Sequence, residues 1–397
     1  MVEAADFRHF WTLDSKIRYL NHGSYGACPR PILEIQSELQ AQLEREPVRF
    51  FSRELEPLAE KAQRALAAFA GAKADDLVFV RNATAGANTV LRSISFSPGD
   101  ELLVTNHAYN ACRNALAYVA ERSGAQIVVA EVPFPIASES EIAGAIVRAV
   151  TPRTRLALID HVTSPTAILF PIEAIVRELT TRGVDVLVDG AHAPGMIPLD
   201  LERLGAAYYT GNCHKWLCAP KGAAFLWVRP DKQSQIVPLS VSHGHNSERR
   251  DRSRFQIEFD WSGTEDPTAF LVVPDAIEFL RAQLGTMEAL YARNHALTCA
   301  ARQILCAALE VPPPCPDAML GSMASIPIDG SGVGRERIDP LQQSLYERGF
   351  ELPIMPWSSP WTNSSPARGG RLLRVSAQLY NSLSDYEALA QALEDLN

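Results

Sequence analysis

Short apolar runs alternate with helical patterns between residues 77 and 228, and this alternation restricts the chain to few folds. Strands that alternate with helices usually form a parallel sheet with helices on both faces. The predicted strands are LVFV (77–80), ELLVT (101–105), QIVVAEV (126–132), RLALIDHV (155–162), VDVLVDGA (184–191), YYTGN and GAAFLWV. We place the last of them at an edge of the sheet. We therefore predict an α/β fold with a mainly parallel seven-stranded sheet, covered by helices at 31–45, 57–70, 84–93, 110–122, 139–149 and 172–182.

The pattern changes after residue 270. Long helical patterns at 272–284 and 286–309 are followed by strands near 318–328 and 371–378, with a helix at 336–348 between them. The stretch 353–370 is rich in Pro, Ser and Gly and predicts a loop. A chain of 397 residues exceeds one typical core. We predict three parts, namely an N-terminal segment (1–30), a large α/β domain (31–270) and a smaller C-terminal α+β domain (271–397).

Charge and cysteine content exclude several classes of protein. The net charge is −9 and no dense Lys/Arg run is present, which argues against a nucleic-acid partner. No window offers the roughly 18 uninterrupted apolar residues of a membrane span, and the first residues lack the apolar core of a signal peptide. The seven cysteines form no CxxC pair and predict neither a disulfide framework nor a metal site. We expect a cytoplasmic protein with reduced cysteines.

Two residues near the centre of the chain indicate chemistry. Asp189 ends a buried-looking strand, so its carboxylate should emerge at the carboxyl end of the sheet, where ligands of α/β proteins bind. Lys215 follows between the polar GNCH and a turn that contains Gly and Pro. A lone Asp there is usually a cap and a lone Lys a solvated charge. Together they match the needs of pyridoxal 5′-phosphate (PLP), a carboxylate for the pyridine nitrogen and a lysine for the imine.

The segment RNATAGANTVLR (81–92) opens a helix directly after a predicted strand. Backbone N–H groups at a helix N-terminus favour a phosphate, and Thr84 adds a hydroxyl donor. An ordinary N-cap by Asn82 or Thr84 explains the same residues. With Asp189 and Lys215 present, we favour a phosphate site.

The motifs NATAGAN, NHAYN, HVTSPT, VDGAHAPG, HKWLCAPKG, GTEDP and RVSAQLYN resemble, in their order and spacing, the class V aminotransferase family of fold-type I PLP-dependent enzymes. Within it, the likeness is to the isopenicillin N epimerase-like branch, and it spans residues 21 to 381. The resemblance implies that Lys215 carries PLP as a Schiff base. It also implies a large PLP-binding domain followed by a small C-terminal domain, with the N-terminal segment contributing to the active site.

Other site residues are implied by the same resemblance, position by position. Those matched to the cofactor are Asp189 at the pyridine nitrogen, His192 at the phenolic oxygen, Thr84, Ala85, Asn212 and His214 at the phosphate, and Tyr109 or His107 over the ring, with Tyr109 preferred. Ser164 stands where many relatives have Asn near the phenolic oxygen. Arg374 matches the arginine that binds the substrate carboxylate, and Asn21, His22 and Tyr25 are candidates for the substrate pocket. Thr264 resembles the residue that reaches the neighbouring subunit's phosphate, which implies a homodimer with shared active sites.

The reaction is not selected by such a fold, because all PLP chemistry begins from the same substrate adduct, the external aldimine. The resemblance favours epimerisation or racemisation at the Cα of an amino acid. The alternative is a lyase that eliminates a β substituent or cleaves a C–S bond, as in cysteine desulfhydrase or hercynylcysteine sulfoxide lyase. An aminotransferase is less favoured. A persulfide-forming desulfurase is disfavoured, because relatives of that kind have a loop cysteine before the C-terminal strand and 353–370 contains none. A nucleotide-binding oxidoreductase or a hydrolase on a doubly wound sheet is disfavoured because neither a GxGxxG nor a GxSxG motif is present.

The polar segment SVSHGHNSERRDRSRF (240–255) precedes Thr264 and carries a cluster of arginines. One hypothesis is that it closes over a neighbour's active site or recognises an acidic substrate tail. The alternative is a solvated loop.

Overall fold

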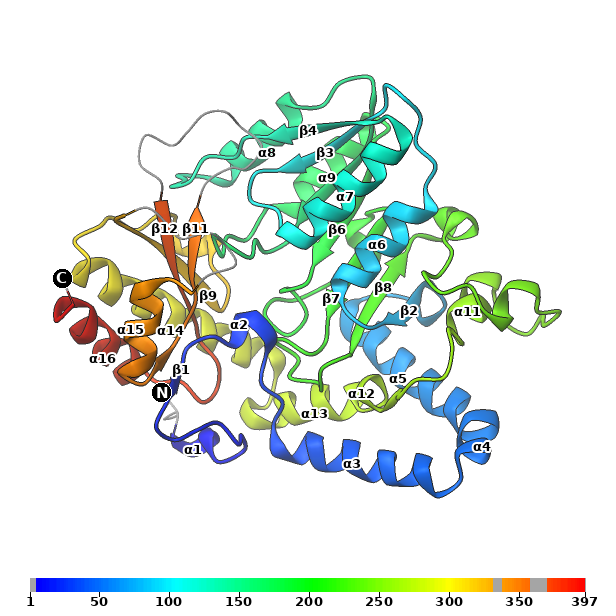
Figure 1. The fold of residues 1–397 in the computed structure, drawn as a ribbon, viewed down its shortest axis with the longest axis horizontal. Coiled ribbons are helices and arrows are strands. Elements are labelled where there is room, and N and C mark those ends of the chain that lie inside the picture. Colours follow the sequence, from blue (N-terminus) through cyan, green and yellow to red (C-terminus); the bar gives the residue numbers. More distant parts are fainter. Residues whose placement is uncertain (1–4, 331–337, 358–369, 397) are drawn as a thin grey trace.

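The computed structural model describes residues 5–330, 338–357 and 370–396. Its centre is a seven-stranded sheet with the order β2-β8-β7-β6-β5-β3-β4 (Figure 1). Strands β3 to β7 run parallel, and β8 is antiparallel to both of its neighbours. The predicted mainly parallel sheet is therefore confirmed. The strands are β2 (Leu77–Val80), β3 (Glu101–Thr105), β4 (Gln126–Ala130), β5 (Thr154–Asp160), β6 (Asp185–Gly190), β7 (Tyr208–Asn212) and β8 (Ala224–Val228).

The predicted position of β8 at an edge of the sheet is wrong. β8 lies between β7 and β2, all five of its residues are buried, and β2 forms the edge. Because β8 returns antiparallel beside β7, its other side stays free for a strand, and β2 from earlier in the chain pairs there. The run AFLWV shows no alternation of apolar and polar residues, which is the pattern of a strand covered on both faces.

Helices cover both faces of the sheet because alternate strand residues point to opposite sides. Leu156 and Leu158 of β5 join a core beneath α6 and α7, whereas Ala157 and Ile159 join the core on the opposite face, beneath α8 and α9. The helices of this part are α3 (Arg30–Arg45), α4 (Pro47–Arg49), α5 (Leu55–Ala70), α6 (Ala83–Ser93), α7 (Asn110–Ser123), α8 (Glu139–Arg148), α9 (Ile172–Thr181), α10 (Leu201–Leu204) and α11 (Arg254–Phe259).

The C-terminal part combines helices with a three-stranded antiparallel sheet of order β11-β12-β9. The predicted helices and strands after residue 270 are present in the described residues, and the first two residues of the helix predicted at 336–348 lie outside them. The loop predicted at 353–370 is wrong at its start, where β11 pairs with β12, and residues 358–369 lie outside the described ranges. The elements are α12 (Thr268–Leu271), α13 (Val273–Leu284), α14 (Met287–Ala308), β9 (Met323–Ile328), α15 (Pro340–Glu347), β10 (Phe350–Glu351), β11 (Ile354–Trp357), β12 (Gly370–Ser376) and α16 (Leu383–Glu394).

The N-terminal segment is tied to the C-terminal part of the chain. It contains α1 (Ala5–Arg8), β1 (Arg18–Tyr19) and α2 (His22–Tyr25), and β1 pairs in parallel with β10. Figure 1 shows α2 between the small sheet and the strands of the large sheet. This placement carries the described part of the N-terminal segment, residues 5–30, to the junction of the two sheets.

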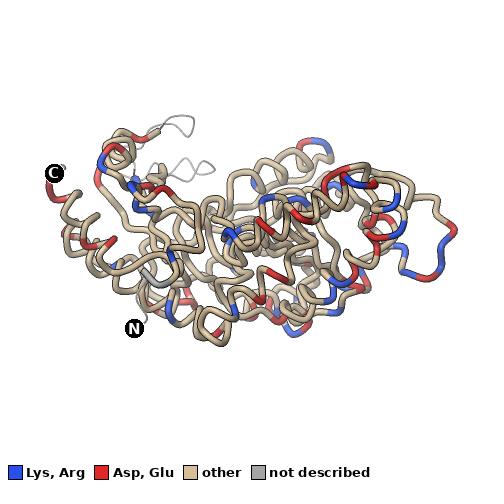
Figure 2. The backbone as a smooth tube through the Cα atoms, turned by 90° about the horizontal axis from the view of Figure 1, so that it is seen from below, with Lys and Arg blue, Asp and Glu red and all other residues tan. Residues whose placement is uncertain are grey.

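Charged residues of both signs are intermixed along the described backbone (Figure 2). Within the described ranges, no helix is long and apolar enough to cross a membrane. No group of three or more His, Cys, Asp or Glu side chains in that part of the chain is arranged to hold a metal ion.

Candidate active site

Asp189 and Lys215 meet at the carboxyl end of the sheet. Asp189 is the penultimate residue of β6, and Lys215 follows the end of the neighbouring parallel strand β7. Lys215 is partly buried, and burial lowers the pKa of its amine to about 7, with a smaller lowering by the charge of Arg374. Asp189 and Cys112 act in the opposite direction. The amine is therefore largely neutral above pH 7, as a nucleophile or a base must be.

His192 contacts this amine in a defined tautomer. Trp216 Nε1–H donates to His192 Nδ1 over 3.4 Å, so the proton of the neutral ring lies on Nε2. Nε2 is 3.1 Å from the Nζ of Lys215 and donates to its lone pair. Burial, followed by the charge of Lys215, lowers the pKa of His192, which keeps the ring neutral. Trp216, which sequence reasoning missed, thus orients His192 toward the lysine.

The carboxylate of Asp189 is held by two donors. The backbone N–H of Ala191 donates to Oδ1 over 3.0 Å, and the thiol of Cys112 donates to Oδ2 over 3.0 Å. Cys112 lies on α7, one turn after Tyr109, and is buried. Nothing in the spacing of the cysteines indicated this contact, because it depends on how α7 lies over β6.

The N-terminus of α6 lies beside the end of β7. Asn82 is its N-cap and accepts from the N–H of Ala85 over 2.8 Å, so capping by Asn82 is present. Asn212 accepts from the N–H of Ala83 over 2.8 Å, which fixes the helix to the segment that leads to Lys215. Gly86 allows this close approach, since a Cβ there would lie 2.1 Å from Thr210 Oγ1. Thr84 lies in the first turn, partly exposed.

A cavity of about 880 Å³ opens at this helix end. Two of the predicted phosphate residues, Ala85 and His214, line it together with Asn82 and with Thr264 of the same chain, whereas Thr84 and Asn212 are not among its lining residues. His214 Nδ1–H donates to the carbonyl of Ala223 over 3.0 Å. Burial lowers the pKa of His214 to about 4, and an anion in the cavity would favour the protonated ring.

Tyr109 and His107 differ sharply in their surroundings. His107 is buried, with Nδ1 2.7 Å from Thr166 Oγ1 and Nε2 3.1 Å from the carbonyl of Val132, so both ring nitrogens are engaged. Tyr109 is 45% exposed, and the charges of Asp189 and Arg374 both act on its hydroxyl. Tyr109 is thus the more accessible of the two rings, and its position over the cofactor stays a prediction.

Arg374 of β12 is buried and forms no ion pair with any described carboxylate. Its Nη1 donates to the carbonyl and hydroxyl of Ser164 over 2.7 and 3.2 Å, and its Nη2 donates to Ser24 Oγ over 2.9 Å. Its Nε has no hydrogen-bond partner among the described residues. A buried guanidinium with an unused donor suits a carboxylate from outside the chain. Ser164 thus contacts this arginine, and its place near the phenolic oxygen of the cofactor stays a prediction.

The N-terminal candidates take different positions. Asn21 accepts a hydrogen bond from Ser24 Oγ over 2.6 Å, and Ser24 in turn contacts Arg374. Sequence reasoning missed this serine. Tyr25 is 73% exposed near Arg374 and Tyr109. His22 is fully buried, with Nδ1 2.7 Å from Tyr380 Oη and Nε2 3.0 Å from the carbonyl of Lys215. Its placement in the substrate pocket is therefore wrong, because both nitrogens hold the protein's own groups.

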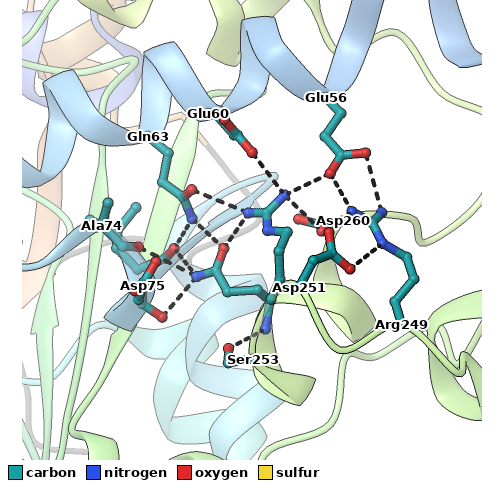
Figure 3. Close-up of polar contacts among 12 residues, drawn as sticks. Glu56, Glu60, Gln63, Ala74, Asp75, Arg249, Asp251, Ser253 and Asp260 are labelled. Atoms are coloured by element: carbon teal, nitrogen blue, oxygen red, sulfur yellow. Dashed lines mark hydrogen bonds and ion pairs between the residues drawn. The ribbon is translucent and has the colours of Figure 1, made fainter. Parts of the chain in front are cut away.

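The arginines of 240–255 are also engaged within the chain (Figure 3). Arg249 pairs with Glu56 of α5 and with Asp251, each at 2.6 Å. Arg254 pairs with Glu258 at 2.6 Å. Arg252 lies 3.0 Å from Asp260 and also bonds Gln256. These contacts tie the segment to α5, and Arg250, which is exposed, forms no ion pair with the described residues.

The donor set fits PLP at this end of the sheet. Lys215 would hold its carbonyl carbon, Asp189 its pyridine nitrogen, and the first turn of α6 with His214 its phosphate. A buried arginine for a carboxylate lies beside them. Fold and site together define a fold-type I PLP-dependent enzyme.

Comparison with known proteins agrees with this class. The Aminotransferase class-V family profile matches residues 30–330. A probable chloroplastic L-cysteine desulfhydrase of Arabidopsis thaliana is 32% identical over 99% of this chain and 85% of its own length. An isopenicillin N epimerase of Amycolatopsis lactamdurans is 32% identical over 99% and 98%. A C-DES variant with glycine covalently linked to its PLP cofactor superposes with a TM-score of 0.79 at 21% identity, covering 98% of this chain and 99% of that one.

The chain belongs to the class V aminotransferase family, and it is a PLP-dependent enzyme. The relatives carry the names of both an epimerase and a lyase. Membership therefore defines the cofactor and leaves the outcome of the reaction to be argued from the site.

Proposed function

We propose that the enzyme removes the α-proton of an amino acid bound through its carboxylate to Arg374, and expels a sulfur substituent from Cβ. Lys215 is the base. One observation carries this proposal. The amine of Lys215 lies near Arg374, and its pKa is lowered to about 7; no other amine in the described part of the chain has both properties. Around it, the pKa of Tyr109 is raised, that of Tyr19 is raised to about 12, and that of His192 is lowered.

One base suffices for elimination. Lys215 takes the proton from Cα, the Cβ–S bond breaks with its electron pair on sulfur, and the sulfur leaves as a thiol after gaining a proton. The remaining three-carbon fragment is hydrolysed to pyruvate and ammonia after release. When bound, the cofactor withdraws electrons from Cα. His192 orients the amine, and Arg374 fixes the carboxylate so that Cα lies within reach of Lys215.

The cysteines of the chain support this outcome over persulfide formation. All seven are free, and burial raises the pKa of every one, including Cys28 to about 12 and Cys315 to about 11. A sulfur acceptor needs an accessible thiolate. Release of sulfide as the free product requires none.

Epimerisation, which the sequence favoured, is the second candidate. It requires a proton donor on the face of Cα opposite Lys215. The exposed hydroxyl of Tyr25, near Arg374 and Tyr109, is the group that favours it. The Amycolatopsis relative is aligned over nearly its whole length, which supports keeping this alternative.

A single incubation separates the two. L-cysteine is supplied in D₂O, and pyruvate, sulfide and the α-deuterium content of recovered cysteine are measured. Equal amounts of pyruvate and sulfide support the lyase. Deuterium incorporation with loss of optical activity and no pyruvate would reject it in favour of the epimerase. Lys215→Ala is the control and should give neither result.

A further inference from the structure

A second aspartate lies beside Asp189, and neither the sequence motifs nor the mechanism uses it. Asp160 is the last residue of β5 and is paired in register with Asp189 of β6. The two strands are parallel, so paired residues point to the same face of the sheet. Leu158 and Leu187, two residues before each aspartate, both join the core under α6 and α7. Both carboxyls therefore face α7, and each residue is only 3% exposed.

The two carboxyls differ in their hydrogen bonds. Asp189 accepts from Ala191 N–H and from the Cys112 thiol, one bond on each oxygen. The Oδ2 of Asp160 has no hydrogen-bond partner among the described residues. Two adjacent carboxylates in a dry site cannot both ionise at low cost. The negative charge belongs on Asp189, because both of its oxygens accept a hydrogen bond, and the proton belongs on Asp160, where one oxygen accepts none.

We propose that Asp160 is a positioning residue that stays a neutral carboxylic acid beside Asp189, so that the pair bears a single negative charge on the Asp189 side. This proposal deepens the role given above to Asp189, on which it rests. The neutral acid supplies a polar neighbour without adding a second negative charge near the pyridine nitrogen. It does so at the point where α7, which begins after Tyr109, meets the sheet.

The charged and titratable groups around Asp160 agree with a neutral acid. Burial raises its pKa well above the usual range, and the charge of Asp189 raises it further. The backbone N–H groups of Tyr109 and Asp160 and the charge of Arg113 lower it by less. Cys112, on the same side, is a thiol whose pKa is also raised. Lys215 is largely neutral above pH 7 and does not offset a second carboxylate there.

Infrared difference spectroscopy tests the protonation directly. The spectrum of Asp160→Asn is subtracted from that of the wild type at about pH 8, with and without PLP. We expect the loss of one C=O stretch of a protonated carboxylic acid, with the isotope shift of an exchangeable proton in D₂O. Asp231→Asn, a change at an exposed aspartate paired with Arg229, should remove an ionised carboxylate band instead. Loss of an ionised band in Asp160→Asn would overturn the proposal.

Cofactor affinity provides a second readout that does not depend on turnover. Asp160→Asn keeps an uncharged polar group of similar shape, and we expect its Kd for PLP to stay within about twofold of the wild type. Asp160→Val keeps a residue suited to a strand but removes all polarity, and we expect PLP to bind about tenfold more weakly. Equal weakening in both variants would mean that an ionised carboxylate is required, and would contradict the proposal. Neither measurement depends on whether the enzyme is a lyase or an epimerase.

Discussion

The amine of Lys215 lies among groups that keep it neutral, and the largest cause is its burial, followed by Arg374. The apoenzyme should therefore capture PLP with a rate that rises with pH and levels off above about 7. An ordinary lysine would keep gaining reactivity up to about pH 10. Stopped-flow absorbance from about pH 5 to about pH 9 measures this profile. A rate that still rises steeply at the upper limit would show that the amine is not perturbed.

Substitution of Arg374 separates charge from shape. Arg374→Gln removes a positive charge, so the pKa of Lys215 should rise and the capture profile should move to higher pH. Arg374→Lys keeps the charge but loses the planar fork, so the profile should stay while KM for the amino acid rises about 100-fold. Arg371→Gln, on the same strand but paired with Asp339, is the control and should leave the profile unchanged. A profile that moves equally in all three variants would contradict the assignment.

Site residues could be predicted from the sequence where a chemically informative residue follows a predicted strand. They could not be predicted where their contacts depend on how strands and helices align with one another. Asp189 and Lys215 follow apolar runs, and chemistry alone points to them. Cys112 and Asp160 acquire meaning only from the alignment of α7, β5 and β6, which no local pattern specifies. His22 shows the opposite error, because its motif resembled a pocket and its ring instead faces the backbone of Lys215.

At the scale of elements, α6 approaches β7 closely because residue 86 has no side chain. In Gly86→Ala, the new Cβ would lie 2.1 Å from Thr210 Oγ1 and 2.8 Å from its Cβ, so the helix must shift. We expect a loss of about 1–3 kcal/mol in the free energy of unfolding. The N–H groups at the start of α6 would move as well, and we expect PLP to bind about tenfold more weakly.

Gly144→Ala provides the matched comparison for chemical denaturation and PLP titration. Gly144 is also within a helix, α8, but the nearest atom to its Cβ is the flexible end of Arg148. Alanine there should leave stability unchanged or raise it slightly. If both variants behave alike, the close contact of α6 with β7 does not hold the phosphate end of the site.

The strands of the large sheet and the long helices followed from periodicity, whereas β1, β10 and β11 were not predicted and the place of β8 in the sheet was wrong. β8 is the last strand of the large sheet in the sequence, yet it lies inside the sheet and not at its edge. It runs antiparallel beside β7, and β2 pairs with its other side. β11 forms within a Pro- and Ser-rich stretch because β12 supplies its hydrogen bonds. Pairing between distant segments decided both cases, and composition does not encode it.

At the scale of the whole molecule, we expect a homodimer in which Thr264 serves the partner's cofactor. Lys215→Ala and Thr264→Glu subunits would be coexpressed with different affinity tags and the mixed dimer isolated. If Thr264 acts across the interface, one site of the mixed dimer is intact, and about half of the wild-type activity should return. The alternative is that Thr264 serves the cofactor of its own subunit, since it lines the same cavity as Ala85 of its own chain. With action inside one subunit, no activity returns.

The pairing of β1 with β10 also has a consequence for the order in which the enzyme is made. Asn21 donates to Glu351, 330 residues later, and Ser24 and His22 on the same segment support Arg374 and Lys215. On the ribosome, β1 and α2 must wait until β10 and β12 have emerged before they find these partners. The large sheet can form during synthesis, but the substrate site is completed only when the last strands arrive, so a nascent chain should acquire its fold before it acquires its activity.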